Sequence, residues 1–174
     1  MTTFYGRKNV HVNIQPNIGL DTSARQGGIE ILTILLADES VLFLKTRRAC
    51  DDAKETDIPG LRSLYDTQSK QITAISKEIT ERIQILGGWQ RDGSEELFDV
   101  SRLDGEISAV PDIVNILADH EAFIRLLRED ARKCSEVYED LGTFHLLVSI
   151  LQTHEKMDWH LRSSFLSARV DEEK

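Results

Sequence analysis

The chain has 174 residues, of which 40% are hydrophobic and 29% are charged, and its formal net charge is −9. This composition is typical of a water-soluble chain with one domain. No run of 18 apolar residues occurs, so we expect no membrane partner, and the first residues lack the apolar region of a secretory signal. The negative charge disfavours unaided binding to nucleic acid. We expect Cys50 and Cys134 to be two reduced thiols, as in most cytosolic proteins.

The N-terminal residues 1–22 are expected to form an extended arm, because apolar and polar residues alternate there and Pro16 opposes a helix. Ser23 is the predicted N-cap of a first helix over residues 24–53. Apolar residues in that segment recur at three- and four-residue spacings, at Leu32, Leu35, Leu36, Leu42 and Phe43.

A second helix is predicted from Pro59, which suits a first turn, to the pair Gly87-Gly88, which ends it. One stripe alternates by three and four residues along its whole length. The stripe comprises Leu61, Leu64, Gln68, Ile72, Ile75, Ile79, Ile83 and Leu86.

The remaining chain predicts a short helix within residues 89–109 and two further long helices. The third long helix is expected from Pro111 to Glu139. After a break at Gly142, the fourth is expected over residues 143–168.

Together these elements predict an all-α fold, a ferritin-like four-helix bundle with a long crossover between helices two and three that carries a short helix. Residues 23–168 would form this domain, and residues 169–174 an acidic tail. A weak internal echo supports two related hairpins, because residues 35–48 and 116–129 share Leu-Ala-Asp at one offset.

Several stretches resemble the Dps proteins, small ferritin-superfamily shells of bacteria, in the same order along the chain. The resemblance implies a cytoplasmic homo-oligomer, a dodecamer with two-fold interfaces and a hollow centre. Such proteins oxidise ferrous iron with peroxide, store the ferric product and in some cases coat DNA. The stretches are LLADESVLFLKTR (35–47), ITERIQILGG (79–88), LADHEAFIRLLRE (117–129), DLGTFHLL (140–147) and HEKMDWHLRSSF (154–165).

The resemblance also locates the family's iron-oxidation site, from which this sequence departs. Cys50 stands where a ligand histidine is usual, and Arg62 replaces a second histidine. Asp66 and Glu81 match ligand carboxylates of the family, whereas Lys77 stands in the place of an aspartate. Two of the five ligand positions are therefore kept.

The spacing of these residues limits what they can do within one chain. Arg62, Asp66, Lys77 and Glu81 fall on one side of the second helix, away from the apolar stripe. Asp66 and Glu81 are about 22 Å apart along the axis, because fifteen residues rise about 1.5 Å each. They can share an ion only if a second copy of the helix approaches antiparallel, as at the family's two-fold interface.

Three interpretations of this set are open. The first is a cross-subunit ion-pair network, because an arginine has no lone pair for a metal and its charge repels Fe²⁺. In the second, the four residues are ordinary solvated charges. The third is a remodelled metal site that uses Asp66, Glu81 and Cys50.

Other candidate sites give weaker signals. Glu39 lies on the apolar side of the first helix, and we expect it at the edge of the buried face, with a partner side chain. His154 and Asp158 have the spacing of a local hydrogen bond. Trp159 and Phe165 are predicted core or interface aromatics. The candidates for contact with DNA are the arm residues Arg7, Lys8 and Arg25.

Three classes of function follow from these observations. The first is a shell that stores or sequesters iron under stress, with its oxidation site largely lost. The second is an active ferroxidase with an unusual site. The third is a nucleoid-associated shell that protects DNA without iron chemistry.

Overall fold

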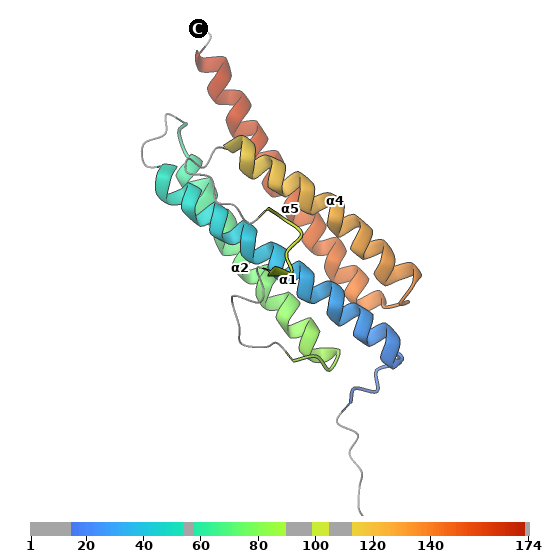
Figure 1. Ribbon diagram of the computed structural model, residues 1–174. Coiled ribbons are helices and arrows are strands. Elements are labelled where there is room, and N and C mark those ends of the chain that lie inside the picture. Colours follow the sequence, from blue (N-terminus) through green and yellow to red (C-terminus); the bar gives the residue numbers. More distant parts are fainter. Residues whose placement is uncertain (1–14, 54–57, 90–98, 105–112, 173–174) are drawn as a thin grey trace, which may run out of the picture.

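Four long helices form a bundle in the part of the chain that the structure describes (Figure 1). The computed structural model describes residues 15–53, 58–89, 99–104 and 113–172. The helices are α1 (Thr22–Asp52), α2 (Leu61–Ile85), α4 (Ile113–Glu136) and α5 (Leu141–Glu172). The all-α, ferritin-like bundle predicted from the sequence is thereby confirmed.

The bundle consists of two helical hairpins. α1 packs mainly on α2, and α4 packs mainly on α5. The interfaces between α1 and α4 and between α2 and α5 are less extensive. The last turns of α5 extend beyond the other helices (Figure 1). Contacts between the two hairpins therefore decide how the bundle holds together.

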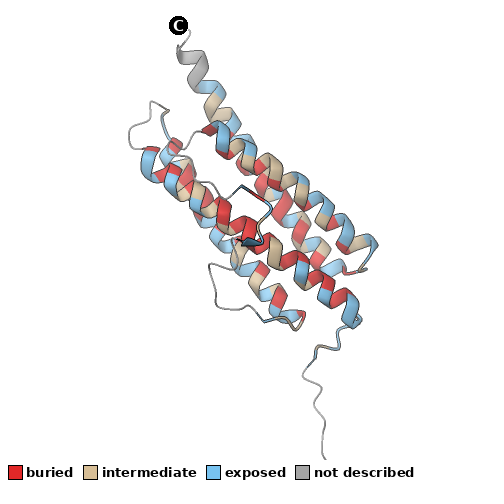
Figure 2. Cartoon of the chain, in the orientation of Figure 1, coloured by how far each residue is buried: buried red, intermediate tan, exposed pale blue. Residues whose placement is uncertain are grey.

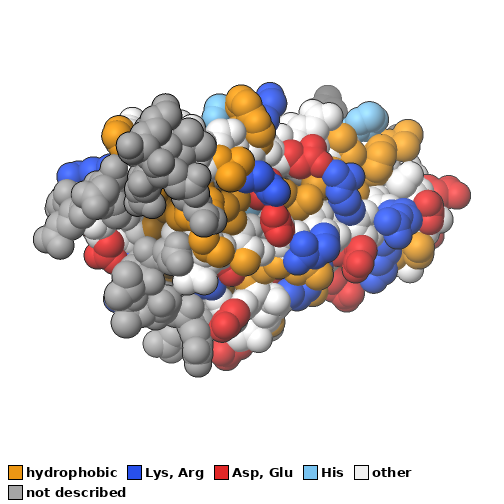
Figure 3. Space-filling model, turned by 90° about the horizontal axis from the view of Figure 1, so that it is seen from above, with side chains coloured by type: hydrophobic (Ala, Val, Ile, Leu, Met, Phe, Trp, Pro, Cys, Tyr) orange, Lys and Arg blue, Asp and Glu red, His pale blue; other side chains and the backbone are white. Residues whose placement is uncertain are grey.

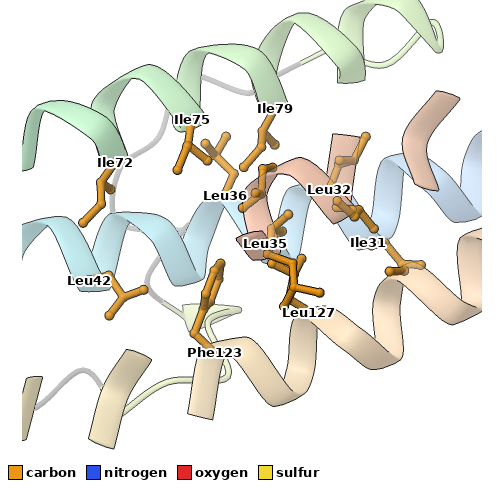
Figure 4. Close-up of a cluster of buried hydrophobic side chains, with 14 of the residues drawn as sticks. Ile31, Leu32, Leu35, Leu36, Leu42, Ile72, Ile75, Ile79, Phe123 and Leu127 are labelled. Atoms are coloured by element: carbon orange, nitrogen blue, oxygen red, sulfur yellow. The ribbon is translucent and has the colours of Figure 1, made fainter. Parts of the chain in front are cut away.

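The buried side of each helix follows the predicted apolar stripes (Figure 2). All of the stripe on α2 is buried except Leu64, which is half-buried. One apolar cluster at the centre joins Leu32, Leu35 and Leu42 of α1 with Phe123 and Leu127 of α4 (Figure 4). Burial of this apolar surface is the main term that favours folding.

Three predicted helix starts are wrong. The cap of α1 is Asp21, not Ser23, because the Asp21 carboxylate accepts from the N–H of Ala24 at 2.7 Å. α2 begins after Gly60, whose positive φ of 80° opens the helix, so Pro59 lies before its first turn. Gly142 does not break the chain but belongs to α5.

The break between α4 and α5 instead lies at residues 137–140. Glu139 adopts a positive φ of 49°, and Asp140 accepts from the N–H of Thr143 at 3.0 Å. An acidic cap at this position satisfies an otherwise free N–H of the first turn. At the other end, α5 continues to Glu172, four residues past the predicted Ala168.

A buried carboxylate fixes the described part of the crossover. Asp38 of α1 accepts from Ser101 Oγ, from the Arg102 N–H at 2.7 Å, and from the Arg102 guanidinium at 2.7 and 2.9 Å. Arg102 also pairs with Asp130 of α4 at 2.8 Å. This clamp joins α1, the crossover and α4.

Several predictions fall outside the described residues: the extended arm up to residue 14, the short helix proposed within residues 89–109, apart from residues 99–104, and the helix start at Pro111. The division into an arm, a domain and an acidic tail stays a prediction.

Candidate functional site

The altered ligand position Arg62, at the start of α2, lies beside Cys50, at the end of α1, in the lining of a surface pocket of about 600 Å³. Cys50 is buried, and its thiol donates to the backbone carbonyl of Arg62 at 3.6 Å. The lining of the pocket also includes Arg47, Asp51, Gly60, Ser63 and Asp66. The structure therefore brings Cys50, Arg62 and Asp66 together around one pocket.

Two cations occupy the Asp66 carboxylate within the chain. Lys70 Nζ lies 2.6 Å from one oxygen, and Arg47 Nη1 lies 3.5 Å from the other. The hydrogen bond from Lys70 lowers the pKa of Asp66, and the charges of Lys70, Arg47 and Arg62 act in the same direction, against a partial desolvation. Arg62 thus contributes at longer range, rather than through a direct ion pair.

Arg47 and Lys70 were not singled out from the sequence. Lys70 follows Asp66 by four residues on one helix, a spacing that does signal a pair. Arg47 lies on a different helix, so its contact depends on how α1 and α2 pack.

The second half of the candidate site lies three turns further along α2. Lys77 Nζ is 3.9 Å from Glu81 Oε1, and both side chains are well exposed. An exposed pair of this kind contributes little to stability by itself. As expected from the spacing, this pair and Asp66 do not meet within one chain.

The residues at these positions do not fit a ferrous ion. Fe²⁺ needs several carboxylate or neutral imidazole donors, but each kept carboxylate here has a cation beside it. Among the described residues, no three His, Cys, Asp or Glu side chains are arranged to hold a metal.

A separate polar chain crosses the interior of the bundle. His154 of α5 places its Nε2 3.0 Å from Glu39 Oε1 and its Nδ1 3.2 Å from the Nδ1 of His120. All three residues are completely buried, and the Phe123 ring packs on His154 with centroids 4.4 Å apart.

The hydrogen-bonded series of Glu39, His154 and His120 corrects two predictions. Glu39 has the expected partner but is fully buried, not at a boundary. His154 does not bond Asp158, which accepts from Arg162 at 2.7 Å instead.

Sequence reasoning missed His120 as the partner of His154, although a signal was present. His120 falls on the apolar stripe of α4 between Ile116 and Phe123, and all three are buried. A polar residue at such a position needs a partner inside the bundle.

Other candidate residues have plainer positions. Arg25, proposed for DNA, is buried and donates to the Leu86 carbonyl at 3.1 Å, so it is occupied within the bundle. Arg7 and Lys8 lie outside the described residues. Trp159 is 60% exposed, and so is not in the core of the chain, whereas Phe165 packs partly buried against its second apolar cluster.

Both cysteines are free and buried in the chain. Burial raises the pKa of the Cys134 thiol to about 12, and the nearby Asp140 and Asp130 act in the same direction. Cys134 is therefore an inert thiol at neutral pH. None of the helices in the described ranges combines the length and the apolar character that a membrane crossing requires.

A family model, the ferritin-like domain, matches residues 29–166, which is most of the chain. The chain belongs to the ferritin-like family. Two curated relatives of this ferritin-like protein come from Nostoc sp. An uncharacterised low temperature-induced protein is 31% identical over 84% of each chain. A nutrient stress-induced DNA-binding protein is 27% identical over 82% of this chain and 79% of that one.

Solved Dps structures share the fold of this ferritin-like chain. DpsC from Streptomyces coelicolor matches with a TM-score of 0.80 and 22% identity, covering 87% of this chain and 90% of that one. A Dps protein from Vibrio cholerae matches with a TM-score of 0.76 and 18% identity, over 86% and 96%. The resemblance to Dps proteins stated from the sequence is confirmed in the fold.

Proposed function

We propose that this ferritin-like protein assembles as a Dps-type shell, a cytoplasmic dodecamer that stores or sequesters iron in stressed cells. The fold and family support the shell, and two relatives are named for induction by low temperature and by nutrient stress. Iron in this proposal is cargo, held as mineral on inner carboxylates.

The observation that carries the proposal is the state of Asp66. In a working site this carboxylate would face the metal, but here Lys70 and Arg47 hold both of its oxygens. Arg62 adds a third positive charge nearby. The inherited oxidation site is thus replaced by ion pairs, which Lys77 and Glu81 of a two-fold mate would complete across the interface.

Assembly is the first test of the proposal. Large apolar side chains stay exposed on the described surface, and an assembly would cover many of them: Leu44, Ile85, Val114, Val137, Leu141, Trp159 and Leu166. Light scattering at micromolar concentration should give about 238 kDa, twelve times 19.8 kDa. A stable monomer or dimer would contradict the shell.

An active ferroxidase is the second candidate. Cys50 supports it, because this buried thiol lies in the pocket beside Asp66. A thiolate with Asp66 and the Glu81 of a mate would form a remodelled metal site. The rate of ferrous oxidation separates the two candidates.

A DNA-coating shell is the third candidate. The chain's similarity to the nutrient stress-induced DNA-binding protein of Nostoc sp. supports it. The net charge of −9 per chain opposes it.

A further inference from the structure

The chain formed by Glu39, His154 and His120 joins the two hairpins of the bundle. Glu39 belongs to α1, in the first hairpin, while both histidines belong to the second. The bond from His154 to Glu39, at 3.0 Å, crosses between the hairpins, whereas the contact of His154 with His120, at 3.2 Å, lies within the closely packed second hairpin of α4 and α5. The bond from His154 to Glu39 therefore joins the two hairpins, and His120 acts on it through His154.

The two contacts set a limit on how many protons Glu39, His154 and His120 can hold together. Each contact needs one proton between its atoms, and a neutral His154 that donates to Glu39 and accepts from His120 satisfies both. If both imidazoles were doubly protonated, two N–H groups would face each other across 3.2 Å and repel. The bridge is intact only while at least one histidine is neutral.

No neighbouring group can relieve an excess proton. His120 Nε2 and Glu39 Oε2 are buried and have no hydrogen-bond partner among the described residues. A proton added at either atom would be a buried donor with no acceptor, which is costly.

The groups packed around the bridge do not change this limit. The buried residues of α2 include no carboxylate, histidine, lysine or arginine. On the other helices, the acids next to the bridge residues in sequence are already paired. They are Asp38 with Arg102, Asp119 with Lys45, Glu121 with Arg162 and Glu155 with Arg128.

We propose that Glu39, His154 and His120 form an acid-sensitive latch that holds the two helical hairpins together at neutral pH and releases them as the pH falls. The proposal concerns the bundle itself and does not depend on iron or on the state of Asp66.

The direction of the pH effect follows from proton linkage. Burial, together with the neighbouring His154, lowers the pKa of His120 well below its ordinary value of 6.5. The unfolded chain takes up this proton near pH 6.5, whereas the folded chain does not, so stability is present above 6.5 and is lost below it. Between pH 7.5 and 5.5 this one group should reduce the folding equilibrium constant about tenfold.

The test compares the full-length protein with His120→Gln in urea unfolding at pH 7.5 and 5.5, at one chain concentration. Glutamine can still donate to His154 Nδ1, but it does not titrate. Over this range the folding equilibrium constant of the wild type should fall about tenfold more than that of His120→Gln. The exposed His145 provides the matched control, and His145→Gln should keep the wild-type pH dependence. Equal losses in wild type and His120→Gln would overturn the proposal.

A second measurement needs no variant. Exchange of the histidine ring C2 proton, followed by mass spectrometry, reports each histidine separately in the intact protein. We expect slow exchange at His120 with no inflection near pH 6.5, while the exposed His145 exchanges faster. An inflection near 6.5 at His120 in the folded protein would show that it protonates freely, and the latch would be wrong.

Discussion

At the scale of single residues, Asp38 makes the most hydrogen bonds of the described buried acids. It is completely buried, and its acceptor atoms are filled by Ser101 and Arg102 of the crossover. Asp38→Ala should lower the free energy of unfolding by about 3–5 kcal/mol, because Arg102 would stay partly buried without its main partner.

Glu30→Ala provides the control for this prediction, since Glu30 is an exposed acid on the same helix. Its effect should stay within about 0.5 kcal/mol. Urea denaturation of both variants at neutral pH measures the difference. Similar values for the two would mean that the clamp on the crossover contributes nothing beyond an ordinary surface charge.

The site residues show what a sequence can reveal at this scale. The side of α2 that carries Arg62, Asp66, Lys77 and Glu81 was predictable, because a helix fixes which residues share a face. The partnership of Asp66 with Arg47 was not, since it depends on the packing of two helices. Nor was the bond from His154 to Glu39, which joins residues 115 positions apart.

At the scale of elements, α1 and the connection between α4 and α5 approach so closely that a glycine is needed. A Cβ at Gly27 would lie 2.1 Å from the Tyr138 ring. Without this contact, Gly→Ala within a helix would gain about 1 kcal/mol. Gly27→Ala should instead destabilise the protein by about 1–3 kcal/mol, because the tyrosine must move.

Thermal unfolding checks the sign of this effect, with the exposed neighbour Gln26→Ala as control. The control should keep the melting temperature or raise it slightly, while Gly27→Ala lowers it. A higher melting temperature for Gly27→Ala would show that the two elements do not pack this tightly in solution.

The helices themselves were largely predictable, and their ends were less so. The stripe on α2 is regular, and a regular stripe identifies both the helix and its buried side. Caps depend on one local hydrogen bond, so Asp21 displaced Ser23, and Asp140 allowed α5 to begin before Gly142. Such choices between neighbouring polar residues leave no periodic trace in the sequence.

At the scale of the whole molecule, charge decides the interaction with DNA. In the proposed shell, twelve chains at −9 each would carry a formal charge of −108. On the face drawn in Figure 3, basic and acidic side chains of the described residues are interspersed rather than gathered by sign. Because the net charge is negative and no basic patch gathers among the described residues of this face, we expect the surface to repel the phosphate backbone.

We therefore expect no retention of plasmid DNA in a gel-shift assay at about 150 mM salt, where the Debye length is about 8 Å. Retention at lower salt alone would be a weak, nonspecific contact. A shift that persists at about 150 mM would show that the arm residues Arg7 and Lys8 bind DNA strongly enough to offset the charge.

The central claim is that ion pairs have replaced iron at the inherited oxidation site. In the variant with Arg62→His and Lys77→Asp, two family ligands return and two positive charges leave the neighbourhood of Asp66 and Glu81. Without metal this variant should assemble less well, because close carboxylates lose their compensation, and added Fe²⁺ or Zn²⁺ should restore assembly.

The most direct measurement is the rate of ferrous oxidation by peroxide in the wild-type shell, followed against buffer alone. The account predicts a rate close to that of buffer. Rapid oxidation, with two ferrous ions bound tightly at each site, would contradict it, and Cys50, Asp66 and Glu81 would then form a working metal site.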